Sequence, residues 1–345
     1  MFLLIGEFTG LFSCLVDPSL KGSFIYLIGT QLHHHPWHGL HFWDLVQPFF
    51  MFIVGVAIPF SVVKRVKLGQ SSRELMRYAI QRSVLLLLLG WALYCIEPER
   101  ITFRFQNVLA QLSVTYLIAF LIRNKSFRVQ LLVSLGLLLV TELIYRFFPV
   151  EGFNHPFTPD QNFGTWLDMQ YGGEDLRGHW VSFNAIPTTA HTIWGVLAGN
   201  LLISDKSPDK KFKLLMLAGV IGIVAGVLLN PVTPIIKRIV TSSFVIVTGG
   251  IALVVLALSY GFIDIKRSRN WVIFFAVVGM NPLFIYLFAH LEGAEFIHHM
   301  FLPFTHALFG WMGELTEGIL TSTLIWAFLW YITWWMYKRK IFIKI

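Results

Sequence analysis

Ten stretches of mostly apolar residues follow one another along the chain, and each is close to the length of a helix that crosses a lipid bilayer. Such a helix needs ~20 predominantly apolar residues. Only 13% of the residues are charged, which excludes a soluble enzyme, a disordered chain, a coiled coil and a disulfide scaffold. The sequence therefore predicts an all-α, polytopic transmembrane helix bundle of about ten spans. The stretches are 1–16, 43–63, 83–97, 106–122, 129–149, 185–204, 213–230, 243–263, 271–290 and 318–337.

Nothing in the sequence separates one part of the chain from another. There is no internal repeat of 20–50 residues, no low-complexity tract and no long polar linker. Residues 1–345 are therefore predicted to form a single integral-membrane domain. Segment 1–16 lacks both the basic start and the small-residue cleavage site of a signal peptide. It is expected to be a retained first helix, shortened by truncation or by a mis-assigned start.

The basic residues are distributed unevenly between alternate connections. Twenty of the 27 lysines and arginines fall in connections on one side, beginning with residues 64–82 and ending with the C-terminus. Because an excess of Lys and Arg marks the cytoplasmic side of a membrane protein, both termini are predicted to be cytoplasmic. Loops 17–42, 150–184 and 291–317 are then expected on the opposite face.

By this topology every histidine lies on the outer face or in the outer half of a span. Histidine exchanges a proton near neutral pH and can act as a nucleophile, but it also suits a membrane interface without any catalytic role, and both interpretations stay open. The twelve histidines are His33, His34, His35, His38, His41, His155, His179, His191, His290, His298, His299 and His306.

The densest histidine cluster is HHHPWHGLHFWD, residues 33–44. Asp44 ends the cluster, where it could be a helix N-cap or could orient an imidazole ring as carboxylates do in acyl-transfer sites. His34 and His38 are four residues apart, as metal ligands can be. No Cys/His ligand pattern or HExxH motif accompanies them, so a site without metal is favoured.

Several polar residues interrupt the apolar stretches. Glu7 has no partner nearby in sequence, whereas Glu142 and Arg146 are spaced to form an ion pair on one helix. Asn107 and Gln111 share a helical face, and Asn281 and His290 roughly share another. Such faces either line a cavity or form hydrogen bonds between helices.

Four stretches, in order, resemble the heparan-alpha-glucosaminide N-acetyltransferase family, including its bacterial members. The most specific is LHHHPWHGLHFWDLVQPFFMFIVGVAIPFS at 32–61. RFQNVLAQLSVTY at 104–116, PIIKRIVTSSFVIVTGG at 234–250 and GMNPLFIYLFAH at 279–290 are also similar to family segments. The chain departs from the family pattern at Gln111, where the family has an arginine, and after Lys237.

The resemblance implies a membrane enzyme that takes acetyl from cytosolic acetyl-CoA and delivers it to an amino sugar or glycan beyond the membrane. The resemblance also implies a protein of the bacterial inner membrane, without a nucleic-acid partner, and suggests a homodimer. His34 matches the family's proposed active-site residue, and the charge pattern independently places it across the membrane from the donor. The acceptor stays open, as does N- or O-acetylation.

Under this hypothesis His34 is the nucleophile or general base, and Asp44 fixes its tautomer. The residues expected to bind substrate or acetyl-CoA are Trp37, His38, Arg104, Asn107, Lys237, Asn281 and His290. Two alternatives stay open: a permease for sugars or lipid-linked glycans, whose polar residues would line a path, and a structural partner in an envelope glycan pathway.

Overall fold

A computed structural model describes residues 1–96, 99–172, 180–267, 271–343 and 345. These residues form helices joined by loops, with no β-strand among them, so the predicted all-α class is confirmed. By internal packing the chain divides into two compact units. The smaller unit comprises 1–34, 41–43 and 266–345, and the larger comprises 35–40 and 44–265. This division concerns packing, and the single integral domain over 1–345 stays a prediction.

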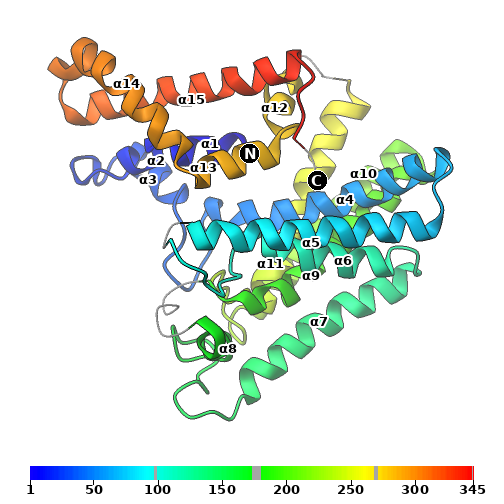
Figure 1. The fold of residues 1–345 in the computed structure, drawn as a ribbon. Helices are drawn as coiled ribbons and strands as arrows, with labels where there is room; N and C mark the ends of the chain where they lie inside the picture. The colour runs from blue at the N-terminus through cyan, green and yellow to red at the C-terminus, as the bar shows by residue number, and fades with distance from the viewer. Residues whose placement is uncertain (97–98, 173–179, 268–270, 344) are drawn as a thin grey trace. The chain divides into compact units, whose positions relative to one another are not determined.

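The larger unit is built around a central helix (Figure 1). Helix α9 packs against α4, α6 and α7, while α10 and α11 pack closely together. The bounds are α4 Val46–Lys67, α5 Ser72–Ile96, α6 Val108–Ile122, α7 Phe127–Phe147, α8 Phe163–Gly172, α9 Ala185–Ile203, α10 Pro208–Leu229 and α11 Ser242–Tyr260, with the short turns η4 Ser182–Asn184 and η5 Gly261–Ile265.

Helices α4 and α9 approach so closely that their backbones touch. A Cβ atom at Gly195 would lie 2.1 Å from the carbonyl oxygen of Phe52, and one at Gly55 would lie 2.1 Å from that of Thr192. Small residues permit this kind of packing between membrane helices, where van der Waals contact replaces the hydrophobic effect. Helix α9 is thereby held as the buried core of the unit.

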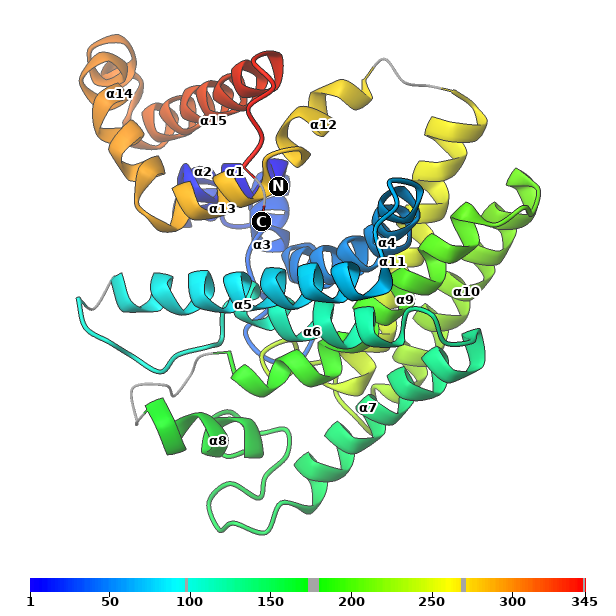
Figure 2. The same ribbon diagram turned by 45° about the vertical axis from the view of Figure 1, so that its right-hand side comes forward.

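The smaller unit joins the two ends of the chain. Helix α15 packs against α1, α2, α12 and α14, and Figure 2 shows α14 turning back toward α15. Trp326 and Ser322 of α15 donate hydrogen bonds to the carbonyls of Phe2 and Thr9. The bounds are α1 Phe2–Phe8, α2 Leu11–Leu15, η1 Pro18–Leu20, α3 Phe24–Gln31, α12 Val272–Gly279, α13 Pro282–His290, α14 Gly293–Phe309, η6 Gly310–Met312 and α15 Glu314–Lys338; the turn η2 Phe42–Leu45 leads into α4.

The number of spans differs from the prediction. All ten predicted stretches contain helix, but in the described part of the chain six helices are long and apolar enough to cross a membrane, or seven if the bent pair α12–α13 is one span. That pair bends by 62°. Segment 1–16 is two short helices separated at Gly10, whose φ is +80°. About ten spans is therefore not confirmed.

The connections contain more helix than the sequence indicated. Helices α3, α8 and α14 lie in regions predicted to be outer loops. Helix α5 begins at Ser72 rather than near residue 83 because Ser71 and Glu74 form a capping box, in which each side chain accepts a hydrogen bond from the other's backbone N–H.

Candidate functional site

Two loops that are far apart in the sequence lie side by side in the larger unit. The backbone N–H of Gly39 donates to the carbonyl of Ile235 at 2.9 Å, and His38 forms an antiparallel bridge with Ile236. Gly39 has φ +137°, and a Cβ there would lie 2.5 Å from the ring of His35, so glycine is required for this approach. The first and third family-like stretches therefore meet.

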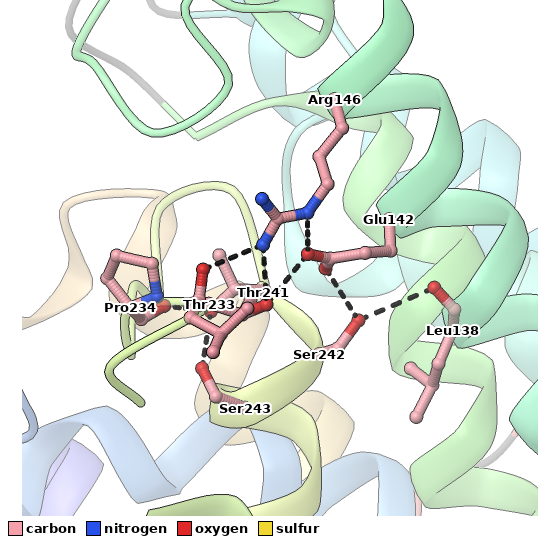
Figure 3. Close-up of polar contacts among 9 residues, drawn as sticks. Leu138, Glu142, Arg146, Thr233, Pro234, Thr241, Ser242 and Ser243 are labelled. Atoms are coloured by element: carbon pink, nitrogen blue, oxygen red, sulfur yellow. Dashed lines mark hydrogen bonds and ion pairs between the residues drawn. The ribbon is translucent and has the colours of Figure 1, made fainter. Parts of the chain in front are cut away.

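A polar cluster on α7 anchors the second of these loops (Figure 3). Glu142 accepts hydrogen bonds from Arg146 at 2.6 Å, from Thr233 at 2.7 Å and from Ser242 at 3.2 Å. Arg146 also donates to the carbonyl of Val232 at 2.7 Å. The predicted structural ion pair is confirmed, and it fixes both ends of the loop that carries Lys237.

A buried ion pair connects the two loops. Asp44 is fully buried, and its Oδ1 lies 3.6 Å from Nζ of Lys237, whose side chain is only 6% exposed. The other oxygen, Oδ2, accepts a hydrogen bond from the backbone N–H of His35 at 3.2 Å. The N-cap position of α4 belongs to Leu45, so Asp44 does not fill the capping role considered from the sequence. It joins the histidine loop to Lys237 instead.

Trp180 lies against the ion pair. The Lys237 ammonium is 4.7 Å from the centroid of the Trp180 ring, and the guanidinium of Arg238 is 5.2 Å from it. Both distances are within the range of cation–π attraction. No sequence pattern indicated a role for Trp180 beyond its place in a predicted outer loop. That loop also accepts a hydrogen bond from Trp37 Nε1, at the carbonyl of Phe157, 2.7 Å away.

A chain of buried polar side chains begins in the first turn of α4. Gln47 donates to Gln111 of α6, Gln111 donates to the carbonyl of Gln106 at 3.1 Å, and Gln106 donates to Asp168 of α8 at 3.1 Å. All four side chains are buried. Gln111 is thus the centre of an interhelical hydrogen-bond chain. Sequence reasoning missed Gln47, Gln106 and Asp168.

Asp168 is the end of this chain. Its carboxylate accepts hydrogen bonds from the Tyr171 hydroxyl, from the Ser182 hydroxyl and from the Ser182 backbone N–H. Burial, together with the hydrogen bond to Asp168, raises the pKa of the Tyr171 phenol well above its ordinary value. Tyr171 is therefore a neutral hydrogen-bond donor at any physiological pH.

Two more predicted residues lie in the larger unit. Asn107 is the N-cap of α6: its Oδ1 accepts from the N–H of Ala110 at 2.9 Å, and its Nδ2 donates to the carbonyl of Gly90 at 2.6 Å. The side chain is thus used structurally, and its binding role stays a prediction. Arg104 is half-buried in the segment before α6.

The predicted catalytic histidine belongs to the smaller unit. His34 is half-buried, and its ring centroid lies 6.5 Å from that of Trp43. In the same unit Asn281 is fully buried at the α12–α13 bend. Its amide donates to the carbonyl of Ile341 and accepts from the N–H of Ile343, both at 3.0 Å. Asn281 thereby fastens the C-terminal segment to the bend.

His290 ends α13 in the smaller unit. Its ring stacks on Tyr286 with centroids 4.1 Å apart and meets Phe8 edge-on. Its Nδ1 donates to the carbonyl of Tyr286 at 2.9 Å.

The structure therefore brings together Asp44, Lys237, Trp37 and His38 in one unit, while His34, Asn281 and His290 belong to the other. In the described ranges no three His, Cys, Asp or Glu side chains are grouped as metal ligands would be.

Comparison with known proteins gives a distant relationship. The chain matches no family model. It is 24% identical over 379 aligned positions to the mouse (Mus musculus) heparan-alpha-glucosaminide N-acetyltransferase, a match that covers 90% of this chain and 56% of the relative. The chain thus spans a little over half the length of that relative. It is a multi-pass helical membrane protein with a distant relationship to a heparan-alpha-glucosaminide N-acetyltransferase.

Proposed function

We propose that this protein is a transmembrane acetyltransferase that moves acetyl from cytosolic acetyl-CoA to an amino sugar or glycan on the extracytoplasmic side. The observation that carries the proposal is the buried Asp44–Lys237 pair. It lies where the first and third family-like stretches meet, in a chain related to an N-acetyltransferase along 90% of its length. Buried charges are costly and persist where they are paired and used.

His34 supplies the reactive nitrogen under this proposal. In one route the imidazole attacks the thioester carbonyl, the C–S bond breaks, and the CoA thiolate leaves as the thiol with the proton from the imidazole N–H. The acceptor amine or hydroxyl then attacks the acetyl-imidazole and releases the ring. In the other route His34 takes the acceptor's proton while the acceptor attacks the thioester carbonyl directly; the C–S bond breaks and the CoA thiolate leaves with the proton that His34 returns. Both routes give free CoA and an acetylated acceptor.

Asp44 and Lys237 would support this chemistry. Asp44 fixes the backbone directly after His34 through the His35 N–H, which restrains where the imidazole can lie. Lys237 carries a positive charge that is buried beside Asp44 within the larger unit, and a charge in such surroundings acts more strongly than it would in water. Trp180 covers that charge, and Trp37 ties the histidine loop to the outer loop.

The remaining assignments complete the proposal. The protein would lie in a bacterial inner membrane with both termini cytoplasmic, the His34 loop extracytoplasmic, and a homodimer as its assembly. Acetyl-CoA is the donor substrate, and no metal is used. The residues proposed to contact donor or acceptor are Trp37, His38, Arg104, Asn107, Lys237, Asn281 and His290.

The test is acetyl transfer by the purified protein. Detergent-solubilised protein is incubated with radiolabelled acetyl-CoA and glucosamine, and both acetylglucosamine and free CoA thiol are measured. We expect transfer by the natural protein, no transfer by His34→Ala, and unchanged transfer by His299→Ala, an exposed histidine on α14. Transfer by His34→Ala at the natural rate would remove His34 from the mechanism. Glucosamine uptake into proteoliposomes without acetyl-CoA, and without acetylation, would favour a permease instead.

Acid-quenched protein distinguishes the two routes. If the imidazole is acetylated, a peptide containing His34 gains the mass of an acetyl group when acetyl-CoA is present and the acceptor is absent. If His34 is a general base, that peptide keeps its mass, and CoA is released only when the acceptor is added.

A further inference from the structure

A cavity of about 70 Å³ lies between α4, α5 and α6 of the larger unit, away from the Asp44–Lys237 pair. One water needs ~10–15 Å³ of such volume, so the cavity has room for about five water-sized atoms. A phosphate group has five heavy atoms. The polar side chains that line it are Ser61, Arg65, Tyr78, Arg82 and Tyr116.

The two arginines are held by aromatic rings. The guanidinium carbon of Arg65 lies 3.6 Å from the centroid of the Tyr78 ring, and that of Arg82 lies 4.6 Å from the centroid of Tyr116. A guanidinium stacked on a ring keeps its in-plane N–H groups available along its edge. Arg65 uses Nη1 to donate to Gln70 at 3.3 Å, but both guanidinium groups line the same small cavity, and two guanidinium groups together can recognise a tetrahedral oxyanion.

One buried donor of Arg82 lacks a partner. Its Nε is buried and has no hydrogen-bond partner among the described residues. The residues that line the cavity include no Asp or Glu. A buried, unsatisfied donor on a cation is rare and calls for an ion or other ligand at that position.

The location limits what that ligand can be. The lining runs from the middle of α4 to its C-terminal end and along the first half of α5, and the two arginines of the cavity belong to the basic segment 64–82. The charge pattern predicts this end to be cytoplasmic. Two phosphate sources meet a membrane protein there: the headgroups of lipids and the phosphates of soluble cofactors such as CoA.

We propose that this cavity binds one phosphate group, held by Arg65 and Arg82 at the predicted cytoplasmic face. The phosphate is either a lipid headgroup or part of the nucleotide end of CoA. Only the CoA source rests on the proposed acetyltransferase function. The acetylation assay with His34→Ala has a different readout, so either proposal can fail alone.

The test compares each phosphate source with a counterpart that lacks phosphate. Delipidated protein is titrated with phosphatidylglycerol or diglucosyl diacylglycerol and followed by native mass spectrometry. Adenosine 3′,5′-bisphosphate and adenosine are compared by equilibrium dialysis. We expect the protein to prefer the phosphate-bearing member of one pair, and that pair identifies the source.

Variants connect the binding to the cavity. The double variant Arg65→Gln with Arg82→Gln should lower the affinity for the preferred ligand about ten- to hundredfold, because hydrogen bonds to a charged group are lost. The matched control is Arg73→Gln with Arg77→Gln, which removes the same charge from exposed positions on α5 and should leave affinity within about twofold. Absence of any preference for phosphate, or equal weakening by both double variants, would overturn the proposal.

A second variant keeps the test informative if the arginine variants fold poorly. Ser61 is exposed and lines the cavity, so Ser61→Trp should fill the opening without removing a charge. We expect the same loss of the preferred ligand. Natural affinity in Ser61→Trp would show that the ligand binds elsewhere and would overturn the proposal.

Discussion

Removing one member of the Asp44–Lys237 pair should lower the free energy of unfolding of the larger unit more than removing both members does. Lys237→Met leaves the fully buried carboxylate of Asp44 without the ammonium. Two unit charges 3.6 Å apart attract by about 4.6 kcal/mol at an effective dielectric constant of ~20. Since part of that attraction only repays desolvation, we expect a loss of about 3–5 kcal/mol in the free energy of unfolding.

The double variant makes this expectation specific. Lys237→Met with Asp44→Asn leaves no buried charge at the site, so its cost should fall well below the sum of the single costs. The resulting coupling energy should be on the order of 3 kcal/mol. Unfolding by sodium dodecyl sulfate, followed by tryptophan fluorescence, measures each variant, and Lys210→Met is the control on an exposed lysine.

Two results would refute the reasoning. A cost for Lys237→Met below about 1 kcal/mol, the usual limit for exposed ion pairs, would mean that water reaches the pair. Additive costs in the double variant would mean that Asp44 and Lys237 do not depend on each other.

Three further changes test the contacts that stabilise each unit internally. Gly195→Ala places a Cβ 2.1 Å from the Phe52 carbonyl oxygen, so it should separate α4 from α9, cost about 1–3 kcal/mol and lower the thermal midpoint. Asn281→Ala removes both hydrogen bonds to the C-terminal segment, and trypsin should then cleave after Lys340 several times faster. Glu142→Gln weakens the anchor of the Lys237 loop, which should cost about 1–3 kcal/mol and lower the denaturation midpoint.

Each of these changes has a matched control. Gly136→Ala adds a Cβ into open space and should be neutral, so equal losses at the two glycines would contradict the close packing. Asn124→Ala and Glu151→Gln alter exposed side chains. If they change proteolysis and unfolding as much as the buried variants do, the hydrogen bonds at Asn281 and Glu142 do not hold these segments.

Local patterns in the sequence predicted local structure well. Apolar stretches of sufficient length became helices, and the spacing of Glu142 and Arg146 correctly predicted their ion pair. Asn107 was expected inside a helix on one face with Gln111, and it is instead the N-cap of that helix. In each case the interaction joins residues within one turn of helix, so the sequence spacing itself contains the geometry.

Contacts between distant segments had no such signal. The partner of Asp44 is Lys237, and the covering ring is Trp180, although no periodicity relates the three residues. The family resemblance marked the stretches around Asp44 and Lys237 but did not say that they touch. The turn chemistry of Gly39 and the loop anchor at Glu142 are what bring them together.

Helix breaks were also beyond the sequence pattern. The stretch 271–290 is apolar apart from Asn281 and His290, so its composition predicted a single span. The 62° bend occurs where Asn281 bonds to the C-terminal segment and where Pro282 begins α13. The proline marks a possible helix start, but the distant backbone that satisfies Asn281 could be found only in the structure.

The two oxygens of Asp44 suggest how its part in the proposed chemistry can be separated from its part in folding. One oxygen lies near the Lys237 ammonium and the other accepts the His35 N–H, so much of the carboxylate's charge is already compensated. Its strongest influence on His34 is then positional, through the adjacent backbone, rather than electrostatic.

In a Lys237→Met background, where no buried ammonium needs the charge, Asp44→Asn keeps an acceptor for that N–H and Asp44→Ala does not. Positioning predicts that Asn retains acetyl transfer within about tenfold while Ala loses considerably more, since one lost hydrogen bond and the resulting misplacement are worth about tenfold or above. Equal losses in both variants, with binding of acetyl-CoA unchanged, would assign the effect to the charge of Asp44.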